Sequence, residues 1–293
     1  MLIGKIKEIW RYPVKSLGGE ILESINVHKC GVAGDRGWAL LDRNSGDICS
    51  AKKLPRLLNL MATYEAEPDS GVAYGESVPP VTIHFPDGGQ CSSGDGQDAA
   101  ISEFVDRPLK LHALEPPENL DHYRMAEPPS EEEFFRALNV KPGEEGPDFS
   151  DYDPAMIETL MEYACPPGTY YDVFPLHLLT TAALDHMTAQ SGEYFDHRRF
   201  RPNLLLETLP GIEGIAEFDW VGRCLQIGGV RLKVESRTIR CSMPAREQVN
   251  YGLVQNAKIS KSLYLSTNRY LGVNLTVVNT GLLRAGDDVE LVD

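Results

Sequence analysis

Paired cysteines, long apolar runs and positive charge are all scarce in this sequence of 293 residues. Its six cysteines form no Cys-x-x-Cys pair, which argues against a zinc site or an iron–sulfur cluster within the chain. No run of about 18 apolar residues occurs, so we expect no transmembrane helix. Residues 1–8 read as a charged strand without the apolar core of a signal peptide, so we expect the cytoplasm and six reduced thiols.

The shortage of positive charge bears on possible partners. The chain has 28 Lys and Arg against 43 Asp and Glu, which gives a net charge of -15. This balance excludes general binding to nucleic acid or to an anionic membrane surface, and it favours solubility. Places where basic residues do gather are therefore candidates for a specific anion site.

Hydrophobic residues make up 42% of the chain, enough for a full globular core. Alternating apolar residues predict strands, and a hairpin over 220–234 turns at Gly228-Gly229. Further strands are expected at 3–10, 21–27, 81–85, 204–206 and 271–278, with a closing pair within 281–292. Capping and breaker residues predict helices at 99–106, 131–138, 154–164 and 176–190. The pattern indicates a mainly β, α+β fold with peripheral helices.

One cysteine is surrounded by arginines in the sequence. Cys241 follows Arg240 directly, and Arg237 and Arg246 are close to it. Nearby guanidinium charge favours the thiolate, the form that binds soft metals or attacks electrophiles. The alternating run 230–234 places the cysteine where a strand opens into a loop. The alternative is a buried structural cysteine.

Two glycine-bounded loops near the N-terminus carry basic residues. Pro13 and Gly18-Gly19 place Lys15 and Ser16 on a loop, where an ammonium and a hydroxyl could hold a phosphate. Arg36 follows a glycine-rich turn, and Asp35 could orient its guanidinium toward an anion. The alternatives are a solvated Lys–Ser pair and a structural Asp–Arg pair.

Two later stretches also suit an anion. Thr180 and Thr181 lie near the start of the helix predicted at 176–190, where free N–H groups and hydroxyls can hold an anion. The run 198–201 holds three arginines just before a buried strand, and Arg201 with Asn203 would border it. The alternatives are ordinary helix capping and a salt-bridge network with the abundant carboxylates.

Several of these motifs together resemble one family. The run 12–16 followed by 34–36 is similar to the N-terminal β-barrel unit of MOSC proteins. The runs 199–204 and 220–223, followed by Arg240-Cys241, are similar to the MOSC domain itself. The family includes bacterial YcbX-like proteins, mitochondrial amidoxime-reducing components and part of the molybdenum cofactor sulfurases. The resemblance covers about 1–60 and 173–293.

The resemblance implies a molybdenum cofactor, a metal held by the dithiolene of molybdopterin with a phosphate tail. Cys241 matches the cysteine that ligates molybdenum, and it would be both the metal ligand and the catalytic centre. Nine residues fall on positions that contact the pterin or phosphate, or lie beside them in the loop before the cysteine: Lys15, Ser16, Arg36, Thr180, Thr181, Arg201, Asn203, Arg237 and Thr238.

Departures from the family pattern lie close to the expected metal. Thr238 stands where many relatives have a second cysteine, and Asn274 stands where some reductive relatives have a tyrosine. The resemblance divides the chain into an N-terminal MOSC β-barrel-like domain at 1–114 and a MOSC domain at 173–293. The acidic, proline-rich insertion at 115–172 between them is either a lid over the site or a surface elaboration.

By this resemblance, the chain is expected to be a molybdenum-dependent oxidoreductase. It would take oxygen from small N-hydroxylated compounds or from N- or S-oxides. No ferredoxin-like cysteine set follows the domain, so electrons would come from a separate ferredoxin- or flavoprotein-like partner. The alternative is a sulfur-transfer or molybdenum-cofactor carrier protein, with a persulfide on Cys241.

Overall fold

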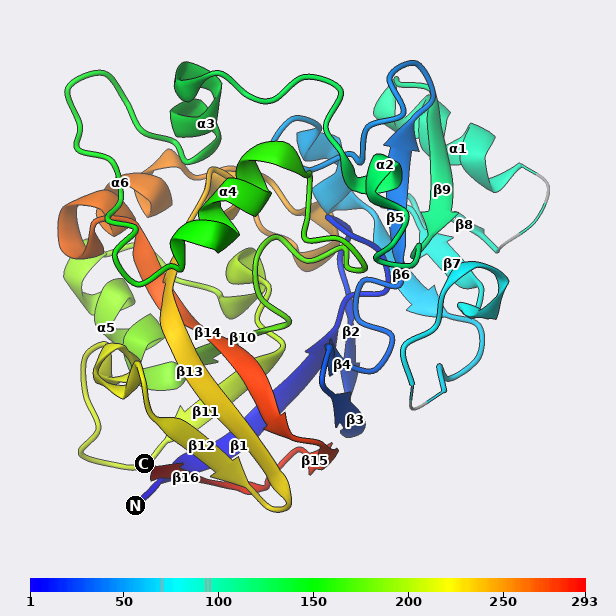
Figure 1. The fold of residues 1–293 in the computed structure, drawn as a ribbon. Coiled ribbons are helices and arrows are strands. Elements are labelled where there is room, and N and C mark those ends of the chain that lie inside the picture. The colour runs from blue at the N-terminus through cyan, green and yellow to red at the C-terminus, as the bar shows by residue number, and fades with distance from the viewer. Residues whose placement is uncertain (70, 93, 95) are drawn as a thin grey trace.

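A closed barrel of seven β-strands forms the centre of the computed structural model, which describes residues 1–69, 71–92, 94 and 96–293 (Figure 1). The order around the barrel is β11-β10-β14-β13-β12-β16-β1, and pairing of β1 with β11 closes it. β10 and β11 run parallel, and the other neighbouring pairs are antiparallel. The predicted mainly β fold with peripheral helices is confirmed.

The barrel strands and the strand that extends their sheet are β1 (Leu2–Arg11), β2 (Glu20–Leu22), β10 (Leu176–Thr180), β11 (Leu204–Thr208), β12 (Cys224–Ile227), β13 (Val230–Ile239), β14 (Tyr270–Asn279) and β16 (Asp288–Val292). The smaller sheets contain β3 (Ser24–His28), β4 (Gly31–Val32), β5 (Trp38–Asp42), β6 (Met61–Tyr64), β7 (Val81–His84), β8 (Gln90–Cys91), β9 (Leu109–Ala113) and β15 (Gly281–Arg284). The α-helices are α1 (Gln97–Val105), α2 (Leu120–Tyr123), α3 (Glu131–Ala137), α4 (Pro154–Glu162), α5 (Thr181–Ser191) and α6 (Ala257–Thr267).

Alternating apolar residues explain why these strands close on themselves. Along β13, Val230, Leu232 and Val234 are fully buried, while the residues between them are partly exposed. Their side chains join those of β1, β10, β11, β14 and β16 in one core, which also holds Trp220. Burying the alternate side chains of every strand in one interior is the main stabilising contribution to such a barrel.

The N-terminal part contributes both to this barrel and to a second core. β1 is a barrel strand, whereas β5–β9 and β6–β7–β8 form two small sheets. Val14, Leu17 and Leu40 pack with these sheets and α1 around a separate core, against which Cys241 also packs. The barrel therefore draws strands from both ends of the chain, and the domain boundaries expected at 114 and 172 stay a prediction.

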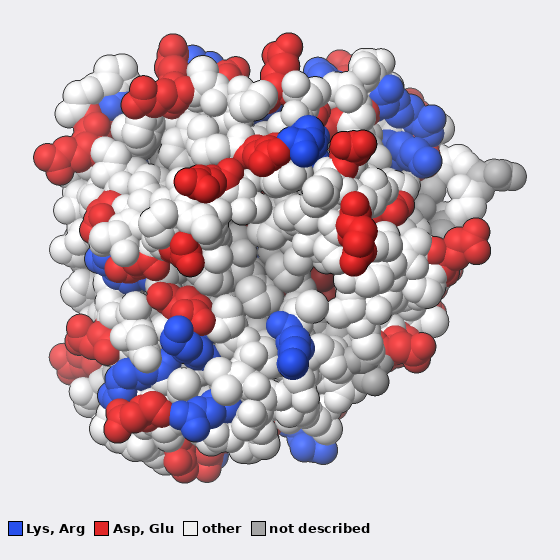
Figure 2. All heavy atoms as spheres, viewed as in Figure 1, with Lys and Arg blue, Asp and Glu red and all other residues white. Residues whose placement is uncertain are grey.

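The acidic insertion contains short helices joined by loops across the upper part of the view, where Asp and Glu side chains gather (Figure 2). α3 begins with the predicted capping box of Ser130 and Glu133, and Asp153 caps α4 through the amide of Ala155. Both helix predictions are confirmed.

Three element predictions were wrong in detail. Residues 176–180 are the strand β10 and not the start of a helix, because this buried apolar run pairs with β11 and β14 before α5 begins at Thr181. The strand expected at 21–27 is divided into β2 and β3. The strands within 281–292 do not pair with each other: β15 pairs with β3, and β16 pairs with β12 and β1.

None of the helices formed by the described residues combines the length and the apolar character needed to cross a membrane.

Candidate functional site

Three segments that are far apart in the sequence meet beside the barrel. They are the loop that follows β1, the run before β11, and the turn that follows β13. Tyr12 donates a hydrogen bond to the carbonyl of Pro202 at 3.1 Å, and Arg201 donates to the carbonyl of Leu17. Arg199 donates to the carbonyl of Pro244 at 3.1 Å. These contacts bring together the predicted arginine run, the loop that carries Lys15 and Ser16, and the loop that follows Cys241.

The aromatic ring of Tyr12 lies at the centre of the cationic residues. The guanidinium of Arg201 lies 4.2 Å from its centroid, and that of Arg36 lies 5.1 Å from it. Cation–π contact holds both guanidinium groups close together, and Arg36 also forms an ion pair with the Asp35 carboxylate, as the structural Asp–Arg alternative predicted. Burial lowers the pKa of Arg201, and repulsion from Arg36 lowers it further.

Three predicted site residues have left-handed backbone conformations. The φ angles are 71° for Ser16, 54° for Arg36 and 55° for Arg201. Non-glycine residues seldom adopt this region, and such strained positions concentrate at binding and catalytic sites. The left-handed conformation at each turn sets the direction of the side chain. Packing around the three turns offsets the cost of this strain.

Arg240 lies next to Cys241 and is fixed at several points. It donates to His177 Nε2 at 3.2 Å and to the carbonyl of Phe200 at 2.7 Å, and it lies over the Phe200 ring. Burial lowers its pKa to about 10, while the electrostatic interaction with Cys241 opposes that shift. At neutral pH the guanidinium therefore remains charged beside the thiol, which is partly exposed and free of any disulfide.

Lys15 and Lys52 share one carboxylate. The Lys15 ammonium donates to Asp172 Oδ1 at 2.7 Å, and the Lys52 ammonium lies 3.5 Å from Asp172 Oδ2. Asp172 first, and then Cys241, raise the pKa of Lys52. Ser16 supports this arrangement, because its hydroxyl accepts from the amide of Ala51, the residue before Lys52. The cluster thus joins the loop after β1 to the end of the insertion.

Not every predicted residue joins the cationic group. The Thr180 hydroxyl donates to the buried Glu217 and accepts from Ala183, as a helix cap does, and Thr181 contacts Thr208. The structure gives neither threonine a hydrogen bond to the basic residues. Both threonines do lie at the start of α5, as expected, but their hydroxyls bond to Glu217, Ala183 and Thr208.

The remaining predicted residues are engaged in the scaffold. The Asn203 side chain accepts from the amide of His177 at 3.2 Å and donates to the Trp10 carbonyl at 3.3 Å, so it joins β10 to β1. Arg237 pairs with Asp151 at 2.6 Å, and the Thr238 hydroxyl donates to Asn274 at 3.0 Å. These interactions support the strand that leads to Cys241.

The insertion holds the same strand through a tyrosine. The buried Tyr152 hydroxyl donates to the Arg237 carbonyl at 2.9 Å and lies 3.4 Å from the amide of Ile239, which donates to it. The amide of Ser242, directly after Cys241, donates to the carbonyl of Ala137 at 3.2 Å. Residues 137–152, which we call the strap, therefore contact the chain on both sides of Cys241.

Sequence reasoning missed Tyr12, Lys52, Asp172, His177 and Tyr152 as parts of this site. Tyr12 belongs to the run 12–16 that is similar to the family's N-terminal unit, and this motif could have identified it. The other four act through contacts between distant segments, for which the local sequence carries no signal.

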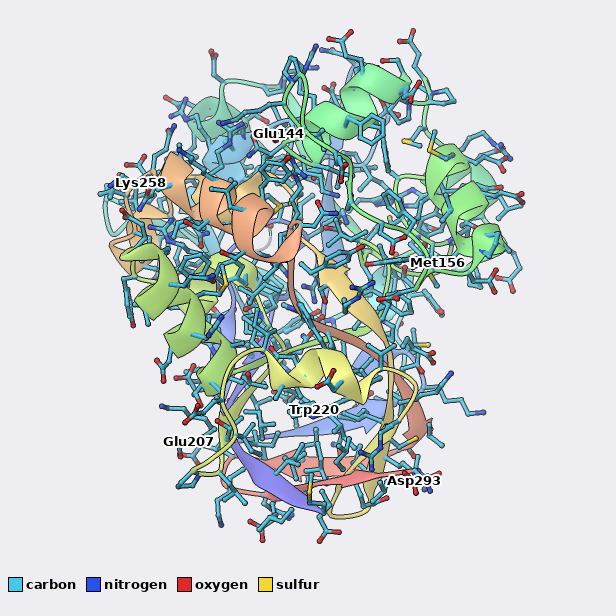
Figure 3. The ribbon with its side chains drawn as sticks, turned by 90° about the vertical axis from the view of Figure 1, so that its left-hand side faces the viewer. Glu144, Met156, Glu207, Trp220, Lys258 and Asp293 are labelled. Atoms are coloured by element: carbon cyan, nitrogen blue, oxygen red, sulfur yellow. The ribbon has the colours of Figure 1, made fainter. Side chains whose placement is uncertain are left out.

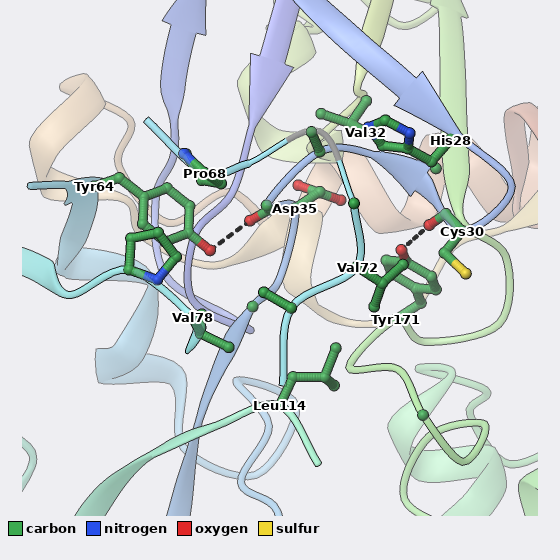
Figure 4. A pocket seen from close by; sticks show the side chains of 18 residues that line it. His28, Cys30, Val32, Asp35, Tyr64, Pro68, Val72, Val78, Leu114 and Tyr171 are labelled. Carbon is green, nitrogen blue, oxygen red and sulfur yellow. Dashed lines mark hydrogen bonds between the residues drawn. The ribbon is translucent and has the colours of Figure 1, made fainter. Parts of the chain in front are cut away.

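A separate pocket of about 40 Å³ is lined by the turn 30–35, Tyr64 and Tyr171, among other residues (Figure 4). Its walls include Asp35 and Tyr171, which precede Arg36 and Asp172 in the sequence. Tyr64 and Tyr171 donate from their hydroxyls to the carbonyls of Gly34 and Cys30. These bonds stabilise the turns that carry Arg36 and Asp172. The pocket therefore adjoins the cationic group, but Arg36, Arg201 and Arg240 do not line it.

Comparison with known proteins identifies the family. The family model of the MOSC domain matches residues 167–290, and that of the MOSC N-terminal beta barrel domain matches residues 3–88. The chain belongs to the MOSC-domain family. The rat protein "Mitochondrial amidoxime reducing component 2" is 23% identical over 98% of this chain and 83% of its own length.

Solved structures give weaker likenesses. The YuaD protein of Bacillus subtilis matches 99% of this chain and 95% of its own, with 10% identity and a TM-score of 0.46. YiiM of Geobacillus stearothermophilus matches 41% of this chain and 55% of its own, with 18% identity and a TM-score of 0.32. The family assignment therefore rests on the two domain matches and the curated relative.

MOSC domains are associated with binding of the molybdenum cofactor. The residues of this chain fit such a group, because two of the cationic side chains near Tyr12 and Cys241 have buried N–H groups to spare. Arg201 Nη2 and Arg240 Nε are buried without a hydrogen-bond partner among the described residues. Buried donors are nearly always paired, so these two are suited to an anionic ligand such as a phosphate.

Proposed function

We propose that this protein is a molybdenum-cofactor enzyme that reduces small N-hydroxylated compounds or N- or S-oxides. The proposal extends the amidoxime reduction named in the rat relative to a chain that shares 23% of its sequence with it. Molybdenum bound to a pterin supplies two-electron redox chemistry with exchange of an oxygen atom. Reduction of an N-hydroxyl group consumes two electrons and two protons and releases water, and the electrons would come from a separate ferredoxin- or flavoprotein-like protein.

One observation carries the proposal: the buried and partly buried arginines differ in their partners. Arg11, Arg36, Arg237 and Arg269 form ion pairs with carboxylates. By contrast, the hydrogen bonds that the structure gives to Arg199, Arg201 and Arg240 go to carbonyls or to an imidazole. The second group lies around Tyr12 and Cys241, and the structure gives it no ion pair with a carboxylate of the described residues.

Uncompensated buried cations are costly, because each guanidinium loses its hydration without gaining a counter-charge. An anionic ligand bound at this place would offset that cost. Such a ligand would lie beside the Cys241 sulfur, which can bind a metal as a thiolate. In this proposal Arg201 and Arg240 hold the phosphate and pterin, while Cys241 ligates the metal. Lys15, Ser16, Arg36 and Lys52 shape and charge the surrounding wall.

The test compares arginines from the two groups in protein made by a host that synthesises the cofactor. Molybdenum and pterin are measured per mole of protein for the unaltered chain, Arg201→Gln and Arg237→Gln. We expect near-equimolar molybdenum and pterin in the unaltered protein, a loss of at least fivefold in Arg201→Gln, and a smaller change in Arg237→Gln. Equal contents in all three would contradict the role of the uncompensated arginines.

No described contact favours the sulfur-carrier alternative over the enzyme. The same preparations distinguish the two, since a carrier with a persulfide would contain labile sulfane sulfur on Cys241 and would turn over no N-hydroxylated substrate with an artificial electron donor.

A further inference from the structure

The guanidinium of Arg240 is held by an unusual partner for a buried cation. His177, from β10, accepts from Arg240 Nη1 at 3.2 Å, while the Phe200 carbonyl accepts from Nη2 at 2.7 Å. The Phe200 ring covers one face with its centroid 5.2 Å from the guanidinium carbon. The third nitrogen, Nε, is buried and has no partner among the described residues. Arg240 therefore has a fixed orientation while its Nε–H stays unpaired.

His177 is itself fixed by its neighbours. Its amide donates to Asn203 Oδ1 at 3.2 Å, and its carbonyl accepts from the Asn203 amide at 2.8 Å. Only 9% of the residue is exposed. Both backbone polar groups of His177 are hydrogen-bonded, and the residue is buried on a barrel strand. Its side chain therefore has little freedom to adopt another position.

Space for the imidazole comes from a glycine on the neighbouring strand. Gly272 of β14 has a φ angle of +77°, and a Cβ there would lie 2.5 Å from His177 Nε2 and 2.6 Å from the Leu178 carbonyl oxygen. The pairing of β13 with β14 is irregular beside it, between Arg237 and Ile239. The strand thus departs from regular geometry where the imidazole and Arg240 meet.

The chemistry of the acceptor determines the charge that remains. Burial, followed by repulsion from Arg240, lowers the pKa of His177 well below its ordinary value, so the imidazole is neutral and Nε2 can accept a hydrogen bond from Arg240. An aspartate or glutamate at this position would make a stronger bond to Arg240 but would cancel its charge. Histidine orients the guanidinium and leaves the full positive charge available.

We propose that His177 is a positioning residue that holds Arg240 as an uncompensated cation beside Cys241, with Gly272 providing the space that the imidazole needs. The inference rests on the proposed function, because it assigns to His177 the task of preparing Arg240 for the anionic part of the ligand. It also predicts that the chain without cofactor binds inorganic phosphate at this site.

The test uses three substitutions of His177 and inorganic phosphate as the probe. His177→Gln keeps a neutral acceptor, His177→Asp supplies a charged one, and His177→Leu removes the acceptor. Phosphate affinity of the cofactor-free protein is measured by calorimetric titration at constant ionic strength. The exposed His186 on α5 provides the control, as His186→Gln. Circular dichroism and the unfolding midpoint of each variant establish that it is folded.

We expect His177→Gln and the control to bind phosphate within about threefold of the unaltered protein. His177→Asp and His177→Leu should bind at least tenfold more weakly, which corresponds to about 1.4 kcal/mol. A merely structural role would make Gln and Asp alike, because both can hydrogen-bond Arg240. Equal phosphate affinity in all folded variants would overturn the proposal.

Failure of the proposed function would look different. In that case the unaltered protein would contain neither molybdenum nor pterin when isolated from the cofactor-producing host, while the phosphate affinities would still follow the order given above.

Discussion

Asp172 and Lys15 form an ion pair at 2.7 Å between the end of the insertion and the loop that follows β1. Lys15 is 4% exposed, and its ammonium also donates to the carbonyls of Tyr170 and Tyr171. The lysine that sequence motifs placed at a phosphate is thus held by three acceptors of its own chain. Its charge is shared with a carboxylate, unlike that of Arg201 and Arg240.

Asp172→Asn tests what this pair contributes. Burial would raise the pKa of Asp172, but Lys15 and Lys52 outweigh it and hold that pKa well below its ordinary value. The ionised form therefore stabilises the folded state above the unfolded pKa of about 4, and this contribution is lost as the pH falls through the lower folded pKa. Since Asp172 is half exposed, we expect Asp172→Asn to cost about 1 kcal/mol at pH 7.

Thermal unfolding at pH 7 and pH 3.5 would measure this contribution, with Asp185→Asn on the exposed part of α5 as the control. A deficit for Asp172→Asn that grows as the pH falls would contradict the sign of the argument.

Glu217 gives a pH dependence of the opposite sign. It is fully buried, its Oε2 accepts from Thr180 at 2.9 Å, and burial raises its pKa to about 7. The folded state therefore binds a proton more tightly than the unfolded chain, and stability falls as the pH rises from about 4 to about 7. Glu217→Gln removes this penalty.

We expect Glu217→Gln to be more stable than the unaltered protein at pH 8 by about 2 to 3 kcal/mol and similar to it at pH 5. Urea unfolding at the two pH values provides the comparison. Equal stabilisation at both values would show that the carboxyl is not protonated in the folded state at pH 5.

Tyr152→Phe tests the strap. The hydroxyl bonds to the Arg237 carbonyl and the Ile239 amide, and Asn274 donates to it at 3.3 Å. Removing it leaves buried polar groups without a partner, which costs about 1 to 3 kcal/mol. Hydrogen exchange should accelerate at Ile239 and in the segment that carries Cys241.

Tyr163→Phe is the matched control, because its hydroxyl accepts from the exposed Arg124. Figure 3 shows the strap residue Glu144 far from Trp220, which lies lower in the view, so exchange of the Trp220 amide provides an internal reference. Uniform acceleration across both regions would contradict a local role for the strap.

Gly272→Ala tests the space around the imidazole. The new Cβ would clash with His177 Nε2 and the Leu178 carbonyl, and alanine at a φ angle of +77° adds backbone strain. Gly46→Ala is the control, since Gly46 has a φ of +79° and no atom lies within 4 Å of the point that its Cβ would occupy. We expect both to lose about 1 kcal/mol from strain, and Gly272→Ala to lose at least twice as much in urea unfolding. Equal losses of unfolding free energy in the two variants would show that a Cβ at position 272 does not clash with its neighbours.

Much of the fold and part of the site could be predicted from the sequence. The hairpin at 220–234, the buried strand before Glu207 and the caps of α3 and α4 follow from local patterns. Of the predicted site motifs, Arg36 and Arg201 both lie against Tyr12, and Cys241 packs on the core that holds Leu17; their role stays a prediction. Each of these features depends on residues within a few positions of one another, or on a family motif.

The rest depends on contacts that local patterns do not encode. The apolar run 176–180 suits a helix as well as a strand, and only its pairing with β11 and β14 decides for the strand. His177 and Asp172 acquire their roles from partners more than 60 and 150 positions away, respectively. Arg237 resembled a site residue because it is near Cys241 in sequence, but the insertion supplies Asp151 to neutralise it.

The most direct test of the account is the molybdenum content of the protein isolated from a host that makes the cofactor, beside Cys241→Ser and Cys30→Ser. Cys30 is an exposed thiol outside the cationic group and serves as the control. We expect near-equimolar molybdenum in the unaltered protein and in Cys30→Ser, and little in Cys241→Ser. Equal molybdenum in all three, or none in any, would contradict Cys241 as the metal ligand.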